Sequence, residues 1–264
     1  MLDITHPSLA PAVRDSLRPA RFPRLSRLLG KALTVGYRLA GRHRYDEFRL
    51  ERVLGATFVV IPTVFNPKLP RTGEFLASQL VAGLGSEAEV LDMGTGSGVC
   101  AVIAARYARR VVAVDINTEA VRCADINVRL NNQHSRVQVR HGDLFAPVAA
   151  ERFDLILFNP PFLRGAPSDD RDRAWRSSDV AERFAAGVAV HLKPGGTALV
   201  LLSSFGGATH FLEQFRRHAL RIEVHAERRF VNEKLVIFRL TRGAATSIHG
   251  EAAAGHGSDG EPGA

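Results

Sequence analysis

The sequence is poor in the residues that crosslink a chain or carry it into a membrane. Only two of its 264 residues are cysteine, Cys100 and Cys123, and they form neither a disulfide framework nor a CxxC metal pair. No apolar run approaches the length of a membrane span, and the first residues are charged and rich in proline, unlike a secretory signal. We therefore expect a cytoplasmic protein that does not enter a membrane.

Several common catalytic patterns are also missing. The chain has no GxSxG sequence, no GxxxxGK[ST] loop and no histidine cluster with metal-ligand spacing. These absences argue against a serine hydrolase, a P-loop nucleotidase and a metal site. What remains is the composition of an ordinary globular protein, with 45% apolar and 23% charged residues.

The net charge of +8 is concentrated near the N-terminus. Residues 1–69 contain 12 Lys or Arg and 5 Asp or Glu, whereas residues 70–264 are nearly balanced, with 23 and 22. A basic arm can contact RNA or a ribosomal surface, because each phosphate contact releases counterions. It can equally be a solvated, arginine-rich face.

Hydrophobic periodicity divides the chain into three parts. Residues 1–63 form a basic N-terminal extension, with an amphipathic helix expected at 24–40 and a hairpin at 47–62. Residues 64–242 alternate between strands and helices, which predicts a doubly wound, mostly parallel, Rossmann-like α/β sheet. Residues 243–264 have almost nothing to bury, and we expect a disordered tail.

Seven strands are expected in the α/β part, and the last two are expected to form a hairpin at the sheet edge. The expected strands are 89–93, 110–115, 136–142, 153–158, 197–202, 221–228 and 234–241. The expected helices are one that follows the proline-rich loop near residue 64 and stops at Gly83 or Gly85, and others at 98–108, 118–131, 179–192 and 207–219.

The stretch VLDMGTGSG (90–98) is a strand followed by a glycine-rich turn that opens a helix. Gly94, Gly96 and Gly98 suit a backbone that turns tightly and admits a ligand, and the helix N-terminus favours an anionic group. The spacing is GxGxG rather than GxGxxG, and Asp92 stands two residues before the first glycine. A carboxylate so close would serve a cofactor with an ammonium group better than it would serve a diphosphate.

Four successive strands end in polar residues: Asp92, Asp115, Asp143 and Asn159. Because the carboxyl ends of parallel strands meet at one edge, these side chains should lie close together. Asp115 suits the diol of a ribose, and Asp143 suits an exocyclic amine. Each acid alone could be a helix cap, but four at one rim indicate a ligand site.

The acidic strand end before GxGxG, the ribose acid, the third acid and NPPF (159–162), in this order, resemble the class I S-adenosylmethionine-dependent methyltransferases that modify planar amino groups. The resemblance covers roughly residues 64–241 and implies S-adenosylmethionine as cofactor. It implies that Asp92 and the three glycines surround the methionine part of the cofactor, that Asp115 holds the ribose hydroxyls and that Asp143 meets the adenine edge. Asn159 would border the cofactor as well as the substrate.

The NPPF stretch has a chemical explanation within that resemblance. A conjugated NH₂ group, as in a glutamine amide, adenine or guanine, is a poor nucleophile. The Asn159 side-chain oxygen and the Pro160 carbonyl can accept its two hydrogens and hold the nitrogen toward the sulfonium methyl. Pro160 and Pro161 stiffen the loop, and Phe162 can stack on the planar group. We therefore predict that Asn159, Pro160 and Phe162 are catalytic and that Pro161 borders the substrate.

The chain is most similar to the short form of the HemK-type release factor glutamine methyltransferases. Residues 64–80 correspond to a segment of that form that folds over the cofactor, which makes Thr72 and Glu74 further candidates for the cofactor site. Residues 227–240 resemble the terminal hairpin of that form. The expected substrate is a glutamine amide of a protein such as a peptide-chain release factor. We expect the loop at 163–179 to border it.

Other functions remain open at this stage. The glutamine-modifying family usually has Tyr where this chain has Phe162, and NPPF is at home among RNA guanine amino methyltransferases. An rRNA or tRNA base, guanine before adenine, is therefore the alternative substrate, with ribosome or RNA contact through the basic arm. Further alternatives are a small molecule or DNA adenine as acceptor, a binding scaffold without catalysis, and an NAD-dependent dehydrogenase. The dehydrogenase would leave NPPF unexplained.

Overall fold

The computed structural model describes residues 11, 13, 48–62, 64, 72–80, 83–161, 163–164, 176–177, 179–204, 207–230 and 233–243. The helix expected at 24–40, the tail after residue 243 and Phe162 lie outside the described residues. None of the helices in the described ranges combines the length and the apolar character that a membrane crossing requires.

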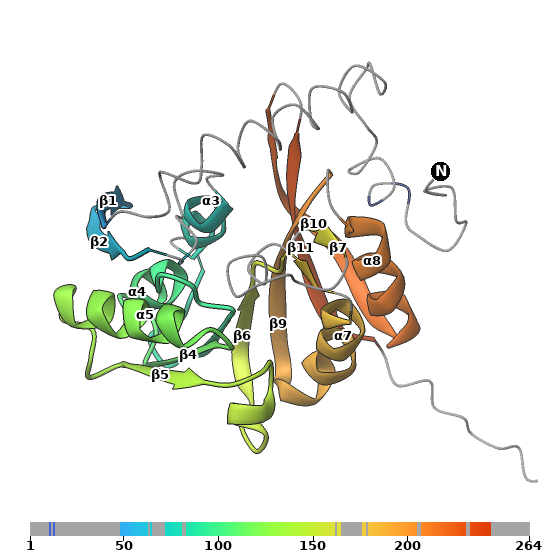
Figure 1. Ribbon diagram of the computed structural model, residues 1–264. Coiled ribbons are helices and arrows are strands. Elements are labelled where there is room, and N and C mark those ends of the chain that lie inside the picture. Colours follow the sequence, from blue (N-terminus) through green and yellow to red (C-terminus); the bar gives the residue numbers. More distant parts are fainter. Residues whose placement is uncertain are drawn as a thin grey trace, which may run out of the picture.

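The centre of the fold is a seven-stranded sheet with the order β10-β11-β9-β6-β3-β4-β5 (Figure 1). The five strands from β9 to β5 pair in parallel, whereas β11 pairs antiparallel with both β9 and β10. This topology confirms the predicted mostly parallel sheet with a terminal hairpin at its edge. The strands are β3 (Glu89–Met93), β4 (Arg110–Asp115), β5 (Val137–His141), β6 (Phe153–Phe158), β9 (Leu192–Ser203), β10 (Leu220–Arg229) and β11 (Lys234–Arg242).

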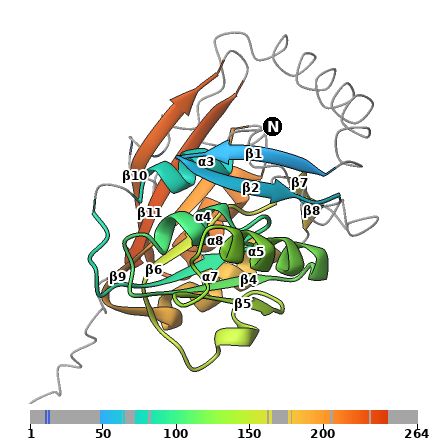
Figure 2. The same cartoon turned by 90° about the vertical axis from the view of Figure 1, so that its left-hand side faces the viewer.

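Helices cover both faces of this sheet (Figures 1 and 2). Consecutive strand residues alternate between two cores: Leu157 joins the cluster under α3, α4 and α5, and Phe158 joins the cluster under α7 and α8. A buried parallel strand needs such apolar residues on both faces, which explains the continuous run in β6. The helices are α3 (Thr72–Ser78), α4 (Val99–Ala104), α5 (Thr118–Leu130), η2 (Ala146–Val148), α7 (Val180–His191) and α8 (Ala208–Arg217).

Some element boundaries were predicted wrongly. The helix expected to stop at Gly83 or Gly85 ends at Ser78, and the helix expected at 98–108 is only Val99–Ala104. Both helices tighten at their ends, where backbone N–H groups bond the carbonyl three residues back, as Gln79 N does with Leu76 O. The strand expected at 197–202 is longer, because β9 already begins at Leu192 beside Phe153.

The hairpin predicted at 47–62 is present as β1 (Arg49–Val53) and β2 (Ala56–Val60). Its two turn residues, Leu54 and Gly55, both have positive φ, as the tight primed turn of a hairpin requires. The hairpin packs on the α/β part of the chain, because the backbone N–H and carbonyl of Val59 bond the buried Asn127 side chain at 2.7 Å each. The predicted boundary between residues 63 and 64 stays a prediction.

Two short strands, β7 (Leu163–Arg164) and β8 (Arg176–Ser177), pair in parallel beyond β6. They belong to the segment 163–179 that the sequence predicts to border the substrate. The intervening residues, with Trp175, lie outside the described part of the chain.

Candidate active site

The glycine-rich turn lies between β3 and α4, as the sequence predicts. Gly94, Gly96 and Gly98 all have left-handed backbone conformations, with φ of 65°, 56° and 81°. A Cβ at Gly98 would lie 3.1 Å from Ala124 Cα, so this glycine allows the turn to pack against α5. Beyond its chain neighbours, no atom of the described residues lies within 4 Å of a Cβ built on Gly96, so this part of the structure leaves the turn open on that side. A ligand can therefore approach the backbone at Gly96 closely.

The side chain of Asp92 binds the turn and the start of the helix that follows it. Its side chain is 3% exposed, and Oδ2 accepts hydrogen bonds from Thr95 Oγ1 at 2.6 Å and from Ala101 N at 3.0 Å. Burial raises the pKa of the Asp92 carboxyl to about 7, and the neighbouring Asp115 adds to this rise. Asp92 thus joins β3 to the start of α4. Its predicted contact with a cofactor ammonium stays a prediction.

Asp115 holds the same turn from the neighbouring strand. Its Oδ2 accepts from Gly96 N at 2.8 Å and its Oδ1 from Asn117 N at 2.9 Å. Burial raises the pKa of the Asp115 carboxyl, although these backbone N–H donors oppose the rise. Each oxygen keeps a second lone pair, so the carboxylate can still accept from a ligand hydroxyl.

Asp143, the third predicted acid, is not alone. It follows β5 and forms an ion pair with Arg183 of α7, which also bonds Asp179 at 3.4 Å. The hydrogen bond to Asp143 raises the pKa of the Arg183 guanidinium. Arg183 could not be assigned this role from sequence patterns, because it lies 40 residues further along the chain. An amine at Asp143 would therefore meet a carboxylate whose Oδ2 is already paired.

Asn159 stands directly behind β6, next to the glycine turn. Met93 of β3 pairs with Phe158 of β6, so the residues that follow these two strands emerge side by side. Asn159 Nδ2 donates to Thr72 Oγ1 of α3 at 3.2 Å. Its Oδ1 is buried and has no hydrogen-bond partner within the described residues. A buried amide oxygen without a donor is a costly arrangement unless a ligand supplies one.

The proline residues behind Asn159 complete the described part of the rim. Pro160 is buried and Pro161 is partly exposed. Phe162, the predicted stacking partner of the substrate, lies outside the described residues. The structure thus brings the glycine turn, Asp92, Asp115 and Asn159 to one edge of the sheet, with Asp143 on the neighbouring strand end.

Two further residues near this edge were not predicted from the sequence as parts of the substrate site. Thr72 was only a minor cofactor candidate, and its bond to Asn159 joins positions 87 residues apart. Ile116 is a large apolar residue directly behind Asp115 and is 40% exposed, and its carbonyl lies 3.0 Å from His141 Nε2. The sequence shows the apolar residue directly behind Asp115, whereas only the structure shows that its side chain is exposed.

Known proteins share parts of this sequence. Residues 55–230 match the family described as "Methyltransferase small domain". A release factor glutamine methyltransferase of Koribacter versatilis is 36% identical over 164 residues, which cover 55% of this chain and 57% of that protein. One from Moorella thermoacetica is 29% identical over 220 residues, which cover 77% and 75%.

A solved structure shares the fold and part of the sequence. The T. thermophilus 16S rRNA N2 G1207 methyltransferase, determined with S-adenosylmethionine and guanosine, superimposes with a TM-score of 0.56. The two chains are 28% identical, and the match covers 74% of this chain and 50% of that one. This chain therefore spans between half and three quarters of the length of these three proteins.

Proposed function

Because the chain belongs to the methyltransferase small domain family, we propose that it transfers a methyl group from S-adenosylmethionine to a glutamine side-chain amide of a protein such as a peptide-chain release factor. The observation that carries this proposal is the buried Asn159 Oδ1, which has no donor within the described residues. A planar NH₂ group would supply that donor. Two relatives named as release factor glutamine methyltransferases support the choice of acceptor.

The site fits this cofactor. The turn is open at Gly96, and Asp115, which accepts from Gly96 N, has lone pairs to spare for the two ribose hydroxyls. Asp92 and the glycine turn would hold the methionine part, and Asp143 would meet the adenine edge. When bound, the cofactor supplies a methyl group activated by a sulfonium centre.

The residues of this chain act by orientation. Asn159 Oδ1 accepts one hydrogen of the substrate NH₂ and the Pro160 carbonyl accepts the other, so that the nitrogen faces the methyl group. Both acceptors stabilise the positive charge that develops as the nitrogen gains the methyl carbon. The surplus proton leaves the nitrogen after transfer, so no group with a shifted pKa is needed as a base.

Replacement of Asp115 by alanine tests the cofactor site. We expect S-adenosylmethionine and its demethylated product to bind more weakly by about 1–3 kcal/mol, because the ribose hydroxyls lose an acceptor and Gly96 N loses its anchor. Isothermal calorimetry measures both affinities. Asp125→Ala is the matched control, since Asp125 is an exposed acid on α5 paired with Arg129. Binding of NAD together with no response to S-adenosylmethionine would contradict the cofactor assignment.

The acceptor is tested with a methyl-labelled cofactor. The wild-type chain and the Asn159→Ala variant are each incubated with a purified release factor and, separately, with ribosomal RNA. We expect label in the release factor, at a glutamine located by mass spectrometry, and none with the variant. Label confined to ribonuclease-sensitive material would overturn the glutamine assignment.

A second acceptor is favoured by two specific observations. The chain has NPPF, with Phe162 where the glutamine-modifying family usually has Tyr, and it shares 28% identity with an rRNA N2-guanine methyltransferase. The exocyclic amine of guanine is planar and would satisfy Asn159 Oδ1 as well as an amide does. The alternative substrate is therefore an RNA base, with the basic residues 1–69 as an RNA contact.

Neutralisation of the basic arm tests this alternative. Val13 is buried in the core under α7 and α8, so substitution is preferable to deletion. If the arm contacts phosphates, replacing five arginines by glutamine should weaken RNA binding and flatten its salt dependence by about 0.7–0.9 per lost contact. The measurement is a salt titration by filter binding, with Arg216→Gln and Arg217→Gln as control. The five arginines to be replaced are Arg14, Arg18, Arg21, Arg24 and Arg27. An unchanged salt slope would mean that these arginines do not contact RNA phosphates and only face solvent.

A further inference from the structure

The side-chain amide of Asn159 is tied at one end only. Its donor end, Nδ2, bonds the hydroxyl oxygen of Thr72 at 3.2 Å, whereas its acceptor end, Oδ1, is buried without a partner in the described part of the chain. Thr72 is itself 1% exposed, so water does not compete for this contact. The two ends of the amide are therefore unequal before any substrate arrives.

The orientation of this amide decides whether the proposed clamp can work. The amide has an acceptor and a donor end of nearly the same shape, and rotation by half a turn exchanges them. In the reversed orientation Nδ2 would face the substrate NH₂, and two donors would oppose each other. With Nδ2 engaged by Thr72, Oδ1 is the end left for the substrate. The Thr72 hydroxyl can accept or donate, so it does not by itself exclude the reversed amide. It supplies the acceptor that Nδ2 needs when Oδ1 faces the substrate, and in this way it supports the productive orientation.

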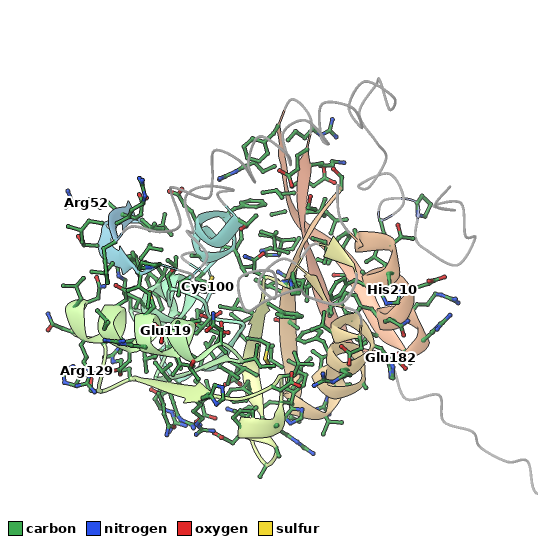
Figure 3. All side chains as sticks on the ribbon, in the orientation of Figure 1. Arg52, Cys100, Glu119, Arg129, Glu182 and His210 are labelled. Atoms are coloured by element: carbon green, nitrogen blue, oxygen red, sulfur yellow. The ribbon has the colours of Figure 1, made fainter. Side chains whose placement is uncertain are left out.

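Thr72 is a firm anchor because the short helix α3 is held from two sides. A seven-residue helix is not stable alone. Leu76 is fully buried in the core that α3 shares with α4, and the Arg228 guanidinium of β10 lies 4.5 Å over the Phe75 ring. Cys100 Sγ of α4, labelled in Figure 3, lies 3.8 Å from Gly73 O. These contacts come from elements on both sides of α3, which Figures 1 and 2 place beside α4 and the β10–β11 strands.

We propose that Thr72 is a positioning residue for methyl transfer, which holds the Asn159 amide so that Oδ1 receives the substrate amine. The inference rests on the proposed function only for its catalytic consequence. The contact itself is a property of the protein without substrate. Neither the glycine turn nor the acids take part in it, so its loss should spare the cofactor.

Two substitutions separate this role from simple packing. Thr72→Val keeps the shape and removes the hydroxyl, whereas Thr72→Ser keeps the hydroxyl and removes a methyl group. We expect Thr72→Val to lower kcat by about tenfold, the scale of one lost hydrogen bond, while KM and cofactor affinity stay within about threefold. Thr72→Ser should stay within about threefold of wild type in kcat. A packing role predicts the reverse order, because valine fills the site better than serine, and that order would overturn the proposal.

A double-mutant comparison places the effect on Asn159. In an Asn159→Ala background Thr72→Val should cause no further loss of turnover, since the amide it orients is gone. An equal loss in both backgrounds would mean that Thr72 acts elsewhere. The acceptor used is whichever of release factor or ribosomal RNA the wild-type chain labels.

A measurement without substrate keeps the test independent of the proposed function. The side-chain amide of Asn159 is observed by ¹⁵N NMR on the full chain and identified by its loss in Asn159→Ala. Thr72→Val should shift this signal and accelerate its hydrogen exchange, and Thr72→Ser should leave both near wild type. If wild type labels no acceptor, the proposed function fails while this result still decides the anchor. An Asn159 amide unaffected by Thr72→Val would refute it.

Discussion

Replacement of Asn159 by alanine should lower the turnover of methyl transfer by about 10²–10³-fold, the usual scale for one preorganised polar contact at a reacting centre. The variant removes the buried oxygen that has no donor within the described residues, and with it the acceptor proposed for the substrate amine. Cofactor affinity should change by less than about threefold, well under the 1.4 kcal/mol of a tenfold change. Label transfer measures the first quantity and calorimetry the second.

The matched control for this experiment is Asn131→Ala. Asn131 lies at the end of α5, where its amide bonds Thr57 O at 2.9 Å and Asn127 O at 2.8 Å, far along the chain from β6. The Asn131→Ala substitution removes an amide of the same size from a position outside the candidate site, so turnover should stay near wild type. An Asn159→Ala protein with normal turnover would remove the basis of the clamp mechanism for any substrate.

Replacement of Asp92 by asparagine should change the pH dependence of stability strongly. Burial raises the pKa of the Asp92 carboxyl from 3.8 to about 7. The folded chain therefore keeps the Asp92 proton at pH values where the unfolded chain has already released it. The stability from this group is therefore complete below about pH 4 and is lost as pH rises toward 7. A difference of about three pH units corresponds to about 4 kcal/mol.

Asparagine cannot ionise, yet its oxygen can accept from Thr95 and Ala101 as Asp92 Oδ2 does. Denaturant unfolding at several pH values should show Asp92→Asn more stable than wild type above pH 7, with the gap closing toward pH 4. Asp154→Asn should behave in the opposite way. The pKa of the Asp154 carboxyl is lowered despite its partial burial, because Lys193 and the Glu89 N–H donate hydrogen bonds to it. The stability that Asp154 contributes to the fold is therefore lost as pH falls. A gap between Asp92→Asn and wild type that does not vary with pH would show that Asp92 is not a buried titrating acid.

The sequence predicts the central strands well because each is a short apolar run between polar residues. The bounds of β3, β4 and β6 agree with the prediction to the residue, since β3 is followed by Gly94, the apolar run of β4 ends at Asp115 and β6 is followed by Asn159-Pro160. Helix ends were predicted less well. They depend on whether an N–H bonds the third or the fourth carbonyl back, a choice that residue type barely influences at Ser78 or Ala104.

The candidate site divides along the same line. The positions of Asp92, Asp115 and Asn159 at one rim follow from strand ends and were predictable. The side-chain partners of Asp143 and Asn159 were not predictable. Arg183 bonds Asp143 from 40 residues away, and Thr72 bonds Asn159 from 87 residues away. Such contacts depend on how helices dock on the sheet, and a pattern that is read along the chain carries no record of docking.

The buried amide of Asn127 links the β1–β2 hairpin to the glycine turn. One side chain bonds Val59 of the hairpin through both its ends and Ser97 O of the glycine turn at 2.9 Å. A ligand that restricts the motion of the turn would therefore also restrict the motion of the hairpin, roughly 40 residues earlier in the chain. By thermodynamic reciprocity, a partner that grips the hairpin would change the cofactor affinity by the same factor. The hairpin is in that sense coupled to the glycine turn at which the cofactor is proposed to bind.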